Sequence, residues 1–279
     1  MSIQTQDQAA AWGAVASAWD ANVEYIDDHS HQATSAVIDR LAIESGQRVL
    51  ELAAGPGTLA KTWSTLVGGR GRVIISDLAP PMVEVAKTRN AGLPPNVSYE
   101  VVDASSIPYG GESFDVVFCR MGLQFAPDPA TAMAEIRRVL APGGRLGLMT
   151  WAAMEHNPWM SCVGMAAMMN GVATGGPPLG PGSIFSLGDE AGLVALVADA
   201  GFADVRSEPA DIVVAASDID SHVSRISALA GPLAAVLQAA TADQRAGMCR
   251  TAADLAAPYR QQDGGYDIPG RVLTLTARC

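Results

Sequence analysis

The chain is poor in positive charge, and its basic residues are scattered. Lys and Arg together number 18 against 29 Asp and Glu, which gives a formal net charge of −11. A protein that grips nucleic acid normally presents a basic stripe to the phosphates, and no cluster of Lys and Arg occurs in this sequence. We therefore expect no nucleic-acid partner. The acidic balance suits small neutral or cationic ligands instead.

Metal motifs, long apolar runs and a leader segment are also missing. The four cysteines, Cys119, Cys162, Cys249 and Cys279, form no CxxC pair and no metal-ligand spacing, so we predict reduced thiols and no metal. The N-terminus has no basic region followed by an apolar core, and no apolar run reaches membrane-spanning length. We expect a cytoplasmic monomer or homodimer with no membrane partner.

Short apolar runs alternate with helical periodicity over the first 150 residues, and 49% of the chain is hydrophobic. Strands alternating with helices at this spacing predict an α/β fold, with a parallel sheet covered by helices on both faces. The expected strands lie at 48–53, 72–77, 97–102, 114–119 and 145–150.

The pattern loosens after residue 151. We expect helices at 158–170 and 189–200, a strand at 203–214, a helical run over 218–259 with a capping box at Thr241 and Gln244, and a closing strand at 271–277. These features predict one domain over residues 1–279. Its parts are a helical N-terminal lid (1–45), a nucleotide-binding core (46–151), a substrate-side insertion (152–202) and C-terminal strands and helices (203–279).

The most informative stretch is a strand that ends in the turn Gly55-Pro56-Gly57 and opens a helix. Such a turn lets a ligand approach the backbone closely and offers free N–H groups at the helix N-terminus. Asp77 is the last residue of the next strand, where a carboxylate can accept hydrogen bonds from both hydroxyls of a ribose. The spacing Gly55-x-Gly57-x-x-Ala60 also fits a dinucleotide fingerprint, so this motif alone leaves a dehydrogenase open.

Four ordered blocks carry a resemblance to a known family. They are VLELAAGPG (49–57), SDLAPPMVEVAK (76–87), VDASSIPYGGESFDVVFCRMGLQF (102–125) and RRVLAPGGRLGLMTW (137–151). Together they resemble the class I S-adenosylmethionine (SAM)-dependent methyltransferases, specifically the UbiE-like small-molecule group. NPW (157–159) and GPGSIFSLGD (180–189) match more loosely. The resemblance implies a Rossmann-like, doubly wound, mostly parallel seven-stranded sheet. Its implied order is 3-2-1-4-5-7-6, with the last strand antiparallel and a helical lid or insertion.

The resemblance also implies SAM as cofactor, S-adenosylhomocysteine (SAH) as product, and a set of residues around the cofactor. Asp77 should bind the ribose hydroxyls, and Asp103 with Ala104 should take the adenine amino group. The whole implied set is Glu51, Ala53, Gly55, Gly57, Asp77, Leu78, Met82, Asp103, Ala104 and Arg120. This chain departs from the family pattern at Ala53, where the family usually has Gly.

The acceptor should lie where the carboxyl ends of the strands open into a crevice. This rule selects the loops after the fourth and fifth strands, together with the N-terminal helices, whose aromatic rings can stack on a planar molecule. Trp12 and Trp19 can equally serve to pack a helix onto the sheet. The residues expected to line the acceptor are Trp12, Trp19, Tyr25, Phe125, Trp151, Asn157 and Trp159.

No catalytic base follows from the sequence alone. His29, His31 and His156 are candidates, and His222 is a weaker one, because histidine titrates near neutral pH. Gln124 can orient an acceptor but cannot titrate. The loop at 175–182 can be read either as a lid over the acceptor or as a surface connection.

We therefore expect an enzyme that moves a methyl group from SAM to O, N or C of a small aromatic or hydrophobic metabolite, such as one of secondary metabolism. Two alternatives stay open. One is an NAD(P)-dependent oxidoreductase, against which the chain lacks a catalytic Tyr-x-x-x-Lys in the 102–115 block. The other is a SAM-binding protein without methyl transfer.

Overall fold

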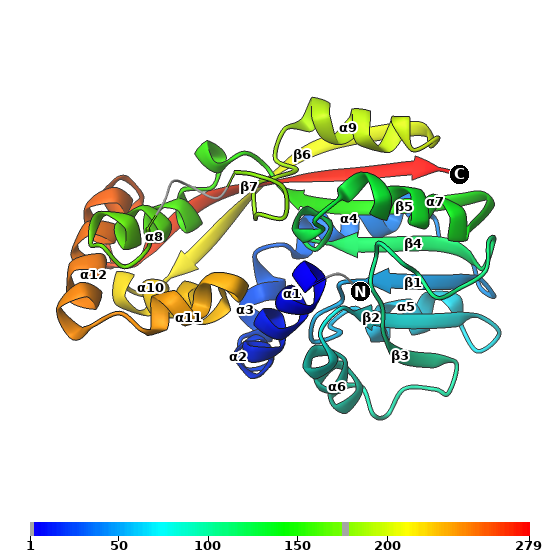
Figure 1. The fold of residues 1–279 in the computed structure, drawn as a ribbon, viewed down its shortest axis with the longest axis horizontal. Coiled ribbons are helices and arrows are strands. Elements are labelled where there is room, and N and C mark those ends of the chain that lie inside the picture. The colour runs from blue at the N-terminus through cyan, green and yellow to red at the C-terminus, as the bar shows by residue number, and fades with distance from the viewer. Residues whose placement is uncertain (1–2, 175–178) are drawn as a thin grey trace.

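The computed structural model describes residues 3–174 and 179–279, and a seven-stranded sheet runs through this part of the chain (Figure 1). The strand order is β3-β2-β1-β4-β5-β7-β6, and β7 runs antiparallel to both of its neighbours. The predicted order and orientation are confirmed. The strands are β1 (Arg48–Leu52), β2 (Arg72–Asp77), β3 (Val97–Val101), β4 (Phe114–Arg120), β5 (Leu140–Trp151), β6 (Ala203–Ala216) and β7 (Tyr266–Arg278).

Helices cover both faces of the sheet because the central strands are buried on both sides. In β1, Val49 faces one apolar cluster and Leu50 faces the other, as the period of two in a strand requires. The helices α4 (His31–Leu41), α5 (Ala60–Val67) and α6 (Pro80–Arg89) pack on the Val49 side. The helices α7 (Pro129–Val139) and α9 (Glu190–Asp199) pack on the Leu50 side.

Three short helices precede α4: α1 (Ile3–Ala14), α2 (Ala16–Ala21) and α3 (Val23–Asp28). Val15 and Ala16 from this segment are buried against Ala79 and Met82 at the start of α6, and against Ala234. The N-terminal segment therefore spans from the cofactor side of the sheet to the C-terminal helices (Figure 1).

The long strands β6 and β7 extend beyond the rest of the sheet, and a group of helices gathers around their far end (Figure 1). These helices are α8 (Pro158–Met169), α10 (Ile219–Leu229), α11 (Ala234–Gln238) and α12 (Ala242–Ala256). The capping box predicted at Thr241 and Gln244 is confirmed at the start of α12. The helical run predicted over 218–259 is divided into α10, α11 and α12. Gly231, with φ +52°, and Pro232 separate α10 from α11, since neither residue suits a helix interior.

Two strands are longer than the sequence indicates. β5 begins at Leu140, which pairs with Phe114 ahead of an irregularity, and the regular register resumes where Arg145 pairs with Val116. β7 begins at Tyr266 because β6 continues to Ala216 and offers it a partner. Pro142, Gly143 and Gly144, which precede the predicted strand at 145–150, form this irregular stretch within β5.

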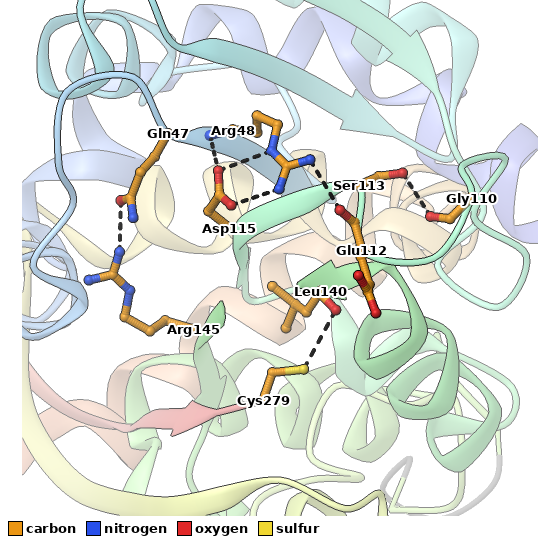
Figure 2. Close-up of polar contacts among 9 residues, drawn as sticks. All are labelled: Gln47, Arg48, Gly110, Glu112, Ser113, Asp115, Leu140, Arg145 and Cys279. Atoms are coloured by element: carbon orange, nitrogen blue, oxygen red, sulfur yellow. Dashed lines mark hydrogen bonds and ion pairs between the residues drawn. The ribbon is translucent and has the colours of Figure 1, made fainter. Parts of the chain in front are cut away.

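A network of polar side chains closes the amino end of the central strands (Figure 2). Arg48 donates two guanidinium hydrogen bonds to the carboxylate of Asp115, at 2.7 and 3.1 Å, and its backbone N–H donates a third at 2.8 Å. The Arg48 hydrogen bonds lower the pKa of Asp115. Arg145 donates to the side chain of Gln47 nearby, at 2.7 Å. In the part of the chain that the structure describes, no helix is long and apolar enough to cross a membrane.

Candidate active site

A cavity of about 580 Å³ lies at the carboxyl ends of β1, β2 and β4. One wall is the turn that follows β1, and the opposite walls come from the N-terminal helices, α8, α10 and α11. Among the described residues that line it, the side chains that carry charge or titrate near neutral pH are Asp77, Asp103, Arg120 and His29. The rest of the lining is largely aromatic, aliphatic and Met-rich.

Asp77 braces the turn after β1. One carboxylate oxygen accepts a hydrogen bond from the Gly55 N–H at 2.9 Å, and the other accepts from the Ala79 N–H at 2.9 Å. Burial raises the pKa of Asp77, while these backbone donors act in the opposite direction. Of the ten residues expected around a cofactor, eight line the cavity: Ala53, Gly55, Asp77, Leu78, Met82, Asp103, Ala104 and Arg120.

Glu51 and Gly57, the other two, do not line the cavity. Glu51 shares the face of Val49 and accepts a hydrogen bond from the indole of Trp63 on α5 at 2.8 Å, where burial raises its pKa to about 7. Gly57 has φ +71°, and a Cβ there would lie 2.7 Å from the Cβ of Ala86 on α6. Both residues therefore support the turn without lining the cavity. Glu51 is hydrogen-bonded within the core, and Gly57 lets α6 pack closely against the turn.

Ala53, which stands where the resembled family usually has Gly, lies opposite a glycine, Gly122. Ala53 has φ +51°, a left-handed conformation that favours glycine, and its methyl group points towards Gly122. A Cβ built on Gly122 would lie only 2.1 Å from the Cβ of Ala53. The alanine in the turn is accommodated because the residue opposite it, beyond β4, has no side chain.

Replacing Gly122 by alanine should therefore destabilise the fold by about 1–3 kcal/mol, the usual cost of overpacking. Adding Ala53→Gly should recover most of that loss because it removes the opposing methyl group. Urea unfolding of both single variants and the double variant gives the coupling energy. Strictly additive effects of the two substitutions would show that the two positions do not compete for one space.

Aromatic rings gather in two groups along the cavity. Trp12 makes edge-to-face contacts with Trp19 and Phe125, at centroid distances of 5.8 and 4.8 Å. The second group is Tyr25, His29, Trp151 and Trp159 (centroid distances 5.0–6.2 Å). The structure thus brings six of the seven expected acceptor residues to the cavity: Trp12, Trp19, Tyr25, Phe125, Trp151 and Trp159.

Asn157, the seventh, is fully buried and does not reach the cavity. Its amide nitrogen donates to the carbonyls of Ala152 and Arg271, at 3.0 and 3.1 Å. Its side-chain oxygen accepts from the indole of Trp159 at 3.2 Å. Every polar atom of this side chain is occupied by its own chain, so Asn157 fixes the orientation of Trp159 rather than meeting a ligand.

His29 is the single histidine among the described lining residues. Its Nδ1 lies 2.7 Å from the backbone oxygen of Tyr25. A carbonyl can only accept, so Nδ1 carries the proton and Nε2 keeps a free lone pair. Burial is the main cause that lowers the pKa of His29, which keeps the ring neutral at neutral pH.

The other candidates for a base or an orienting group lie elsewhere. His31 and His156 are exposed, outside the cavity. His222 is fully buried, and its Nε2 lies 2.6 Å from the backbone oxygen of Trp159. Gln124 is also fully buried and donates to the Met121 carbonyl at 3.0 Å. Helical spacing cannot separate His29 from His31, because the packing of α3 decides which of them faces inward.

Sequence reasoning missed the wall formed by α10 and α11, whose Ile226, Leu229, Val236 and Leu237 line the cavity. The signal was an apolar face repeated along 219–237, which looks the same when it packs onto a sheet. The loop at 175–182, which the sequence leaves open as a lid or a surface connection, falls partly on 175–178, outside the described residues. Gly182, at its far end, lines the cavity.

Part of the chain that lines this cavity is similar to known methyltransferases. A family model described as a methyltransferase domain matches residues 49–144. The ubiquinone/menaquinone biosynthesis C-methyltransferase UbiE of Shewanella frigidimarina is 36% identical over 121 residues, 43% of this chain and 48% of that protein. UbiE of Erwinia tasmaniensis is 37% identical over 123 residues, 43% of this chain and 49% of that protein. The chain spans about half the length of these curated relatives.

Solved structures match over nearly the whole chain. The YcgJ protein of Bacillus subtilis has a TM-score of 0.60 and 21% identity, covering 89% of this chain and 98% of its own. A putative methyltransferase of Bacillus halodurans has a TM-score of 0.56 and 18% identity, covering 88% and 97%. At these identities the likeness shows a shared fold.

Proposed function

We propose that this chain, whose residues 49–144 match a family model described as a methyltransferase domain, is a class I SAM-dependent methyltransferase that moves the methyl group of SAM to O, N or C of a small, uncharged, apolar acceptor. One observation carries the proposal. A single cavity joins a nucleoside-type end, with Gly55, Asp77 and Asp103, to an apolar end lined by aromatic rings and methionines.

The residues at the first end fit SAM by their chemistry. Gly55 has φ +54°, and a Cβ there would meet only the ring of Trp19, at 3.8 Å, so the turn presents bare backbone to the cavity. The carboxylates of Asp77 and Asp103 are acceptors that suit ribose hydroxyls and an adenine amino group, and hydrogen bonds to charged acceptors are the strong ones. Leu78 and Met82 would hold the adenine ring between them.

The other end of the cavity has no fixed charge to offer an acceptor. Among the described lining residues there, His29 is neutral, and the neighbouring cation Arg120 is already paired with Asp27 at 3.0 Å. Burying an ammonium or carboxylate without a partner is costly, so an uncharged molecule is favoured. The rings of Trp12, Trp19 and Trp151 suit a flat acceptor, and they also stabilise a nearby cation through their π faces.

The chemistry is an in-line displacement. Bound SAM supplies a methyl group on a positively charged sulfur, which leaves with the bonding electron pair as the new bond to the acceptor forms. The chain contributes orientation and the exclusion of water, which together can lower a barrier by about 7–11 kcal/mol. Where the acceptor atom carries a proton, the lone pair on Nε2 of His29 takes it, so His29 is the proposed general base.

Two measurements test this function. Calorimetry with SAM, SAH and NAD(P) should show binding of the first two alone. Incubation with methyl-labelled SAM and panels of quinols, phenols, amines and carboxylates should release SAH and label uncharged acceptors. Binding of NAD(P) without SAM would indicate an oxidoreductase. Binding of SAM without label in any acceptor or in a metabolite extract would indicate a binding protein.

A further inference from the structure

Three separate segments of the chain meet at one hydrogen-bonded triangle. Asp27 on α3 accepts from Arg120 at 3.0 Å and from the hydroxyl of Thr58 at 3.0 Å. Arg120, at the end of β4, also donates to the Thr58 hydroxyl at 2.7 Å. Thr58 follows directly on the glycine turn, and both Thr58 and Arg120 line the cavity. The N-terminal segment is thereby tied to the proposed cofactor loop.

The Asp27–Arg120 pair is less exposed to solvent than the second ion pair made by helices α1 to α3, which joins Asp20 to Arg89. The Arg120 side chain is 12% exposed, the lowest value for any ion-paired cation in the described residues, and Asp27 is 32% exposed. Asp20 and Arg89 join α2 to α6 at a similar distance, 2.7 Å, but are 43% and 38% exposed. Sheltered pairs are screened less by water, whereas exposed pairs contribute little.

The helix that carries Asp27 has little to hold it by itself. α3 has six residues, and its N-cap residue, Asn22, makes no side-chain capping hydrogen bond. Helices this short are unstable without tertiary contacts. The same helix supplies Tyr25 to the cavity, and the Tyr25 carbonyl fixes the ring of His29, which caps the helix at its C-terminal end. Where α3 sits therefore decides where His29 sits.

We infer that Asp27 is a positioning residue: through Arg120 and Thr58 it holds α3 against the cofactor loop, so that the loop and His29 reach their working positions together. This inference rests on the proposed function of the same site. Asp27 would thus anchor the N-terminal segment (residues 1–45). The affinity for the cofactor would then depend on Asp27, although this side chain does not line the cavity.

The test compares Asp27→Asn with Asp20→Asn in the full chain. Both substitutions remove a carboxylate that pairs an N-terminal helix with an arginine from another part of the chain, Arg120 or Arg89. In Asp27→Asn we expect the Kd for SAH to rise about tenfold and kcat to fall by a similar factor. In Asp20→Asn both should stay within about twofold of the parent. Asp27→Glu, which keeps the charge, should recover most of the loss.

The titration of His29, followed by NMR, separates movement from simple electrostatics. The charges around the ring are Arg120, which lowers its pKa, and Asp27 and Asp28, which raise it, while burial lowers it most. If α3 stays in place, removing the Asp27 charge must lower the pKa of His29 further. If α3 detaches, the ring regains water and its pKa rises towards 6.5. We expect the rise.

A fall or no change in that pKa, with unchanged SAH affinity, overturns the inference, and so does an equal loss in Asp20→Asn. If Asp27→Asn does not fold, Asp27→Glu is used instead. A small rise in the pKa of His29 in this variant supports the inference, and an unchanged pKa refutes it. The titration needs no turnover. A parent protein that neither binds SAH nor forms it therefore defeats the proposed function, while the anchoring role is still judged from His29.

Discussion

Replacing Asp77 by alanine is expected to weaken the binding of SAM and SAH by about 1–3 kcal/mol, the cost of leaving buried polar partners unpaired. The side chain has two duties in the structure. It accepts from the N–H groups of Gly55 and Ala79, and it faces the cavity where a ribose would lie. Calorimetry with SAH on Asp77→Ala and Asp77→Asn measures the effect. Unfolding curves show how much of it reflects a loosened turn.

Asp77→Asn keeps the shape of the side chain but loses its charge and one acceptor, so it should fall between the parent and the alanine variant. Unchanged affinity in Asp77→Ala would mean that the ribose assignment is wrong. Loss of affinity together with a matching loss of stability would assign the residue to the turn alone.

Replacing His29 by glutamine should lower kcat by about 10²–10⁴-fold for an acceptor that must lose a proton, while the Kd for SAH stays nearly unchanged. His31→Gln is the matched control, since His31 lies two residues away and is exposed. Methyl transfer is measured as SAH release under saturating SAM. An equal loss in both variants, or none in either, would rule out His29 as the base.

The pH dependence follows from the same residue. Burial lowers the pKa of His29 below its ordinary value of 6.5, so the neutral ring with its free lone pair dominates at neutral pH. Protonation removes the lone pair. The rate should therefore be level around neutral pH and fall as the pH drops through the lowered pKa of His29. In His29→Gln this acid limb should disappear.

Local patterns predict the strands and the cofactor end of this fold well. Apolar runs end at Asp77 and at the turn from Gly55 to Gly57, and parallel strands bring such ends to one edge. The pleat of β1 also fixes the direction of one buried side chain. Glu51 follows Val49 by two residues, so both lie on the face of the sheet that α5 covers. Sharing that face does not by itself keep Glu51 out of the cavity wall, since Trp151 and Trp159 belong to the same apolar cluster and do line the cavity. The hydrogen bond from Trp63 holds the Glu51 carboxylate in the core.

The acceptor end depends on contacts that no local pattern encodes. Asn157 follows the fifth strand as a ligand-binding residue might, yet its amide is consumed by the backbone of Ala152 and Arg271, the latter distant in sequence. His29 and His31 differ only in how α3 and α4 pack. The pairing of Ala53 with Gly122 likewise needs two loops to meet. Long-range packing decides each case, so the structure was needed.

The two ends of the cavity come from different stretches of the chain, and this division has an evolutionary consequence. The proposed methyl-donor end is built within 49–120, whereas α8, α10 and α11 contribute much of the proposed acceptor wall and lie beyond residue 144, where the match to the family model stops. If the proposed function holds, substitutions along 158–169 and 219–238 should change which acceptor is methylated and leave the donor chemistry intact. Exchanging those helices between related proteins is thus a direct route to new selectivity.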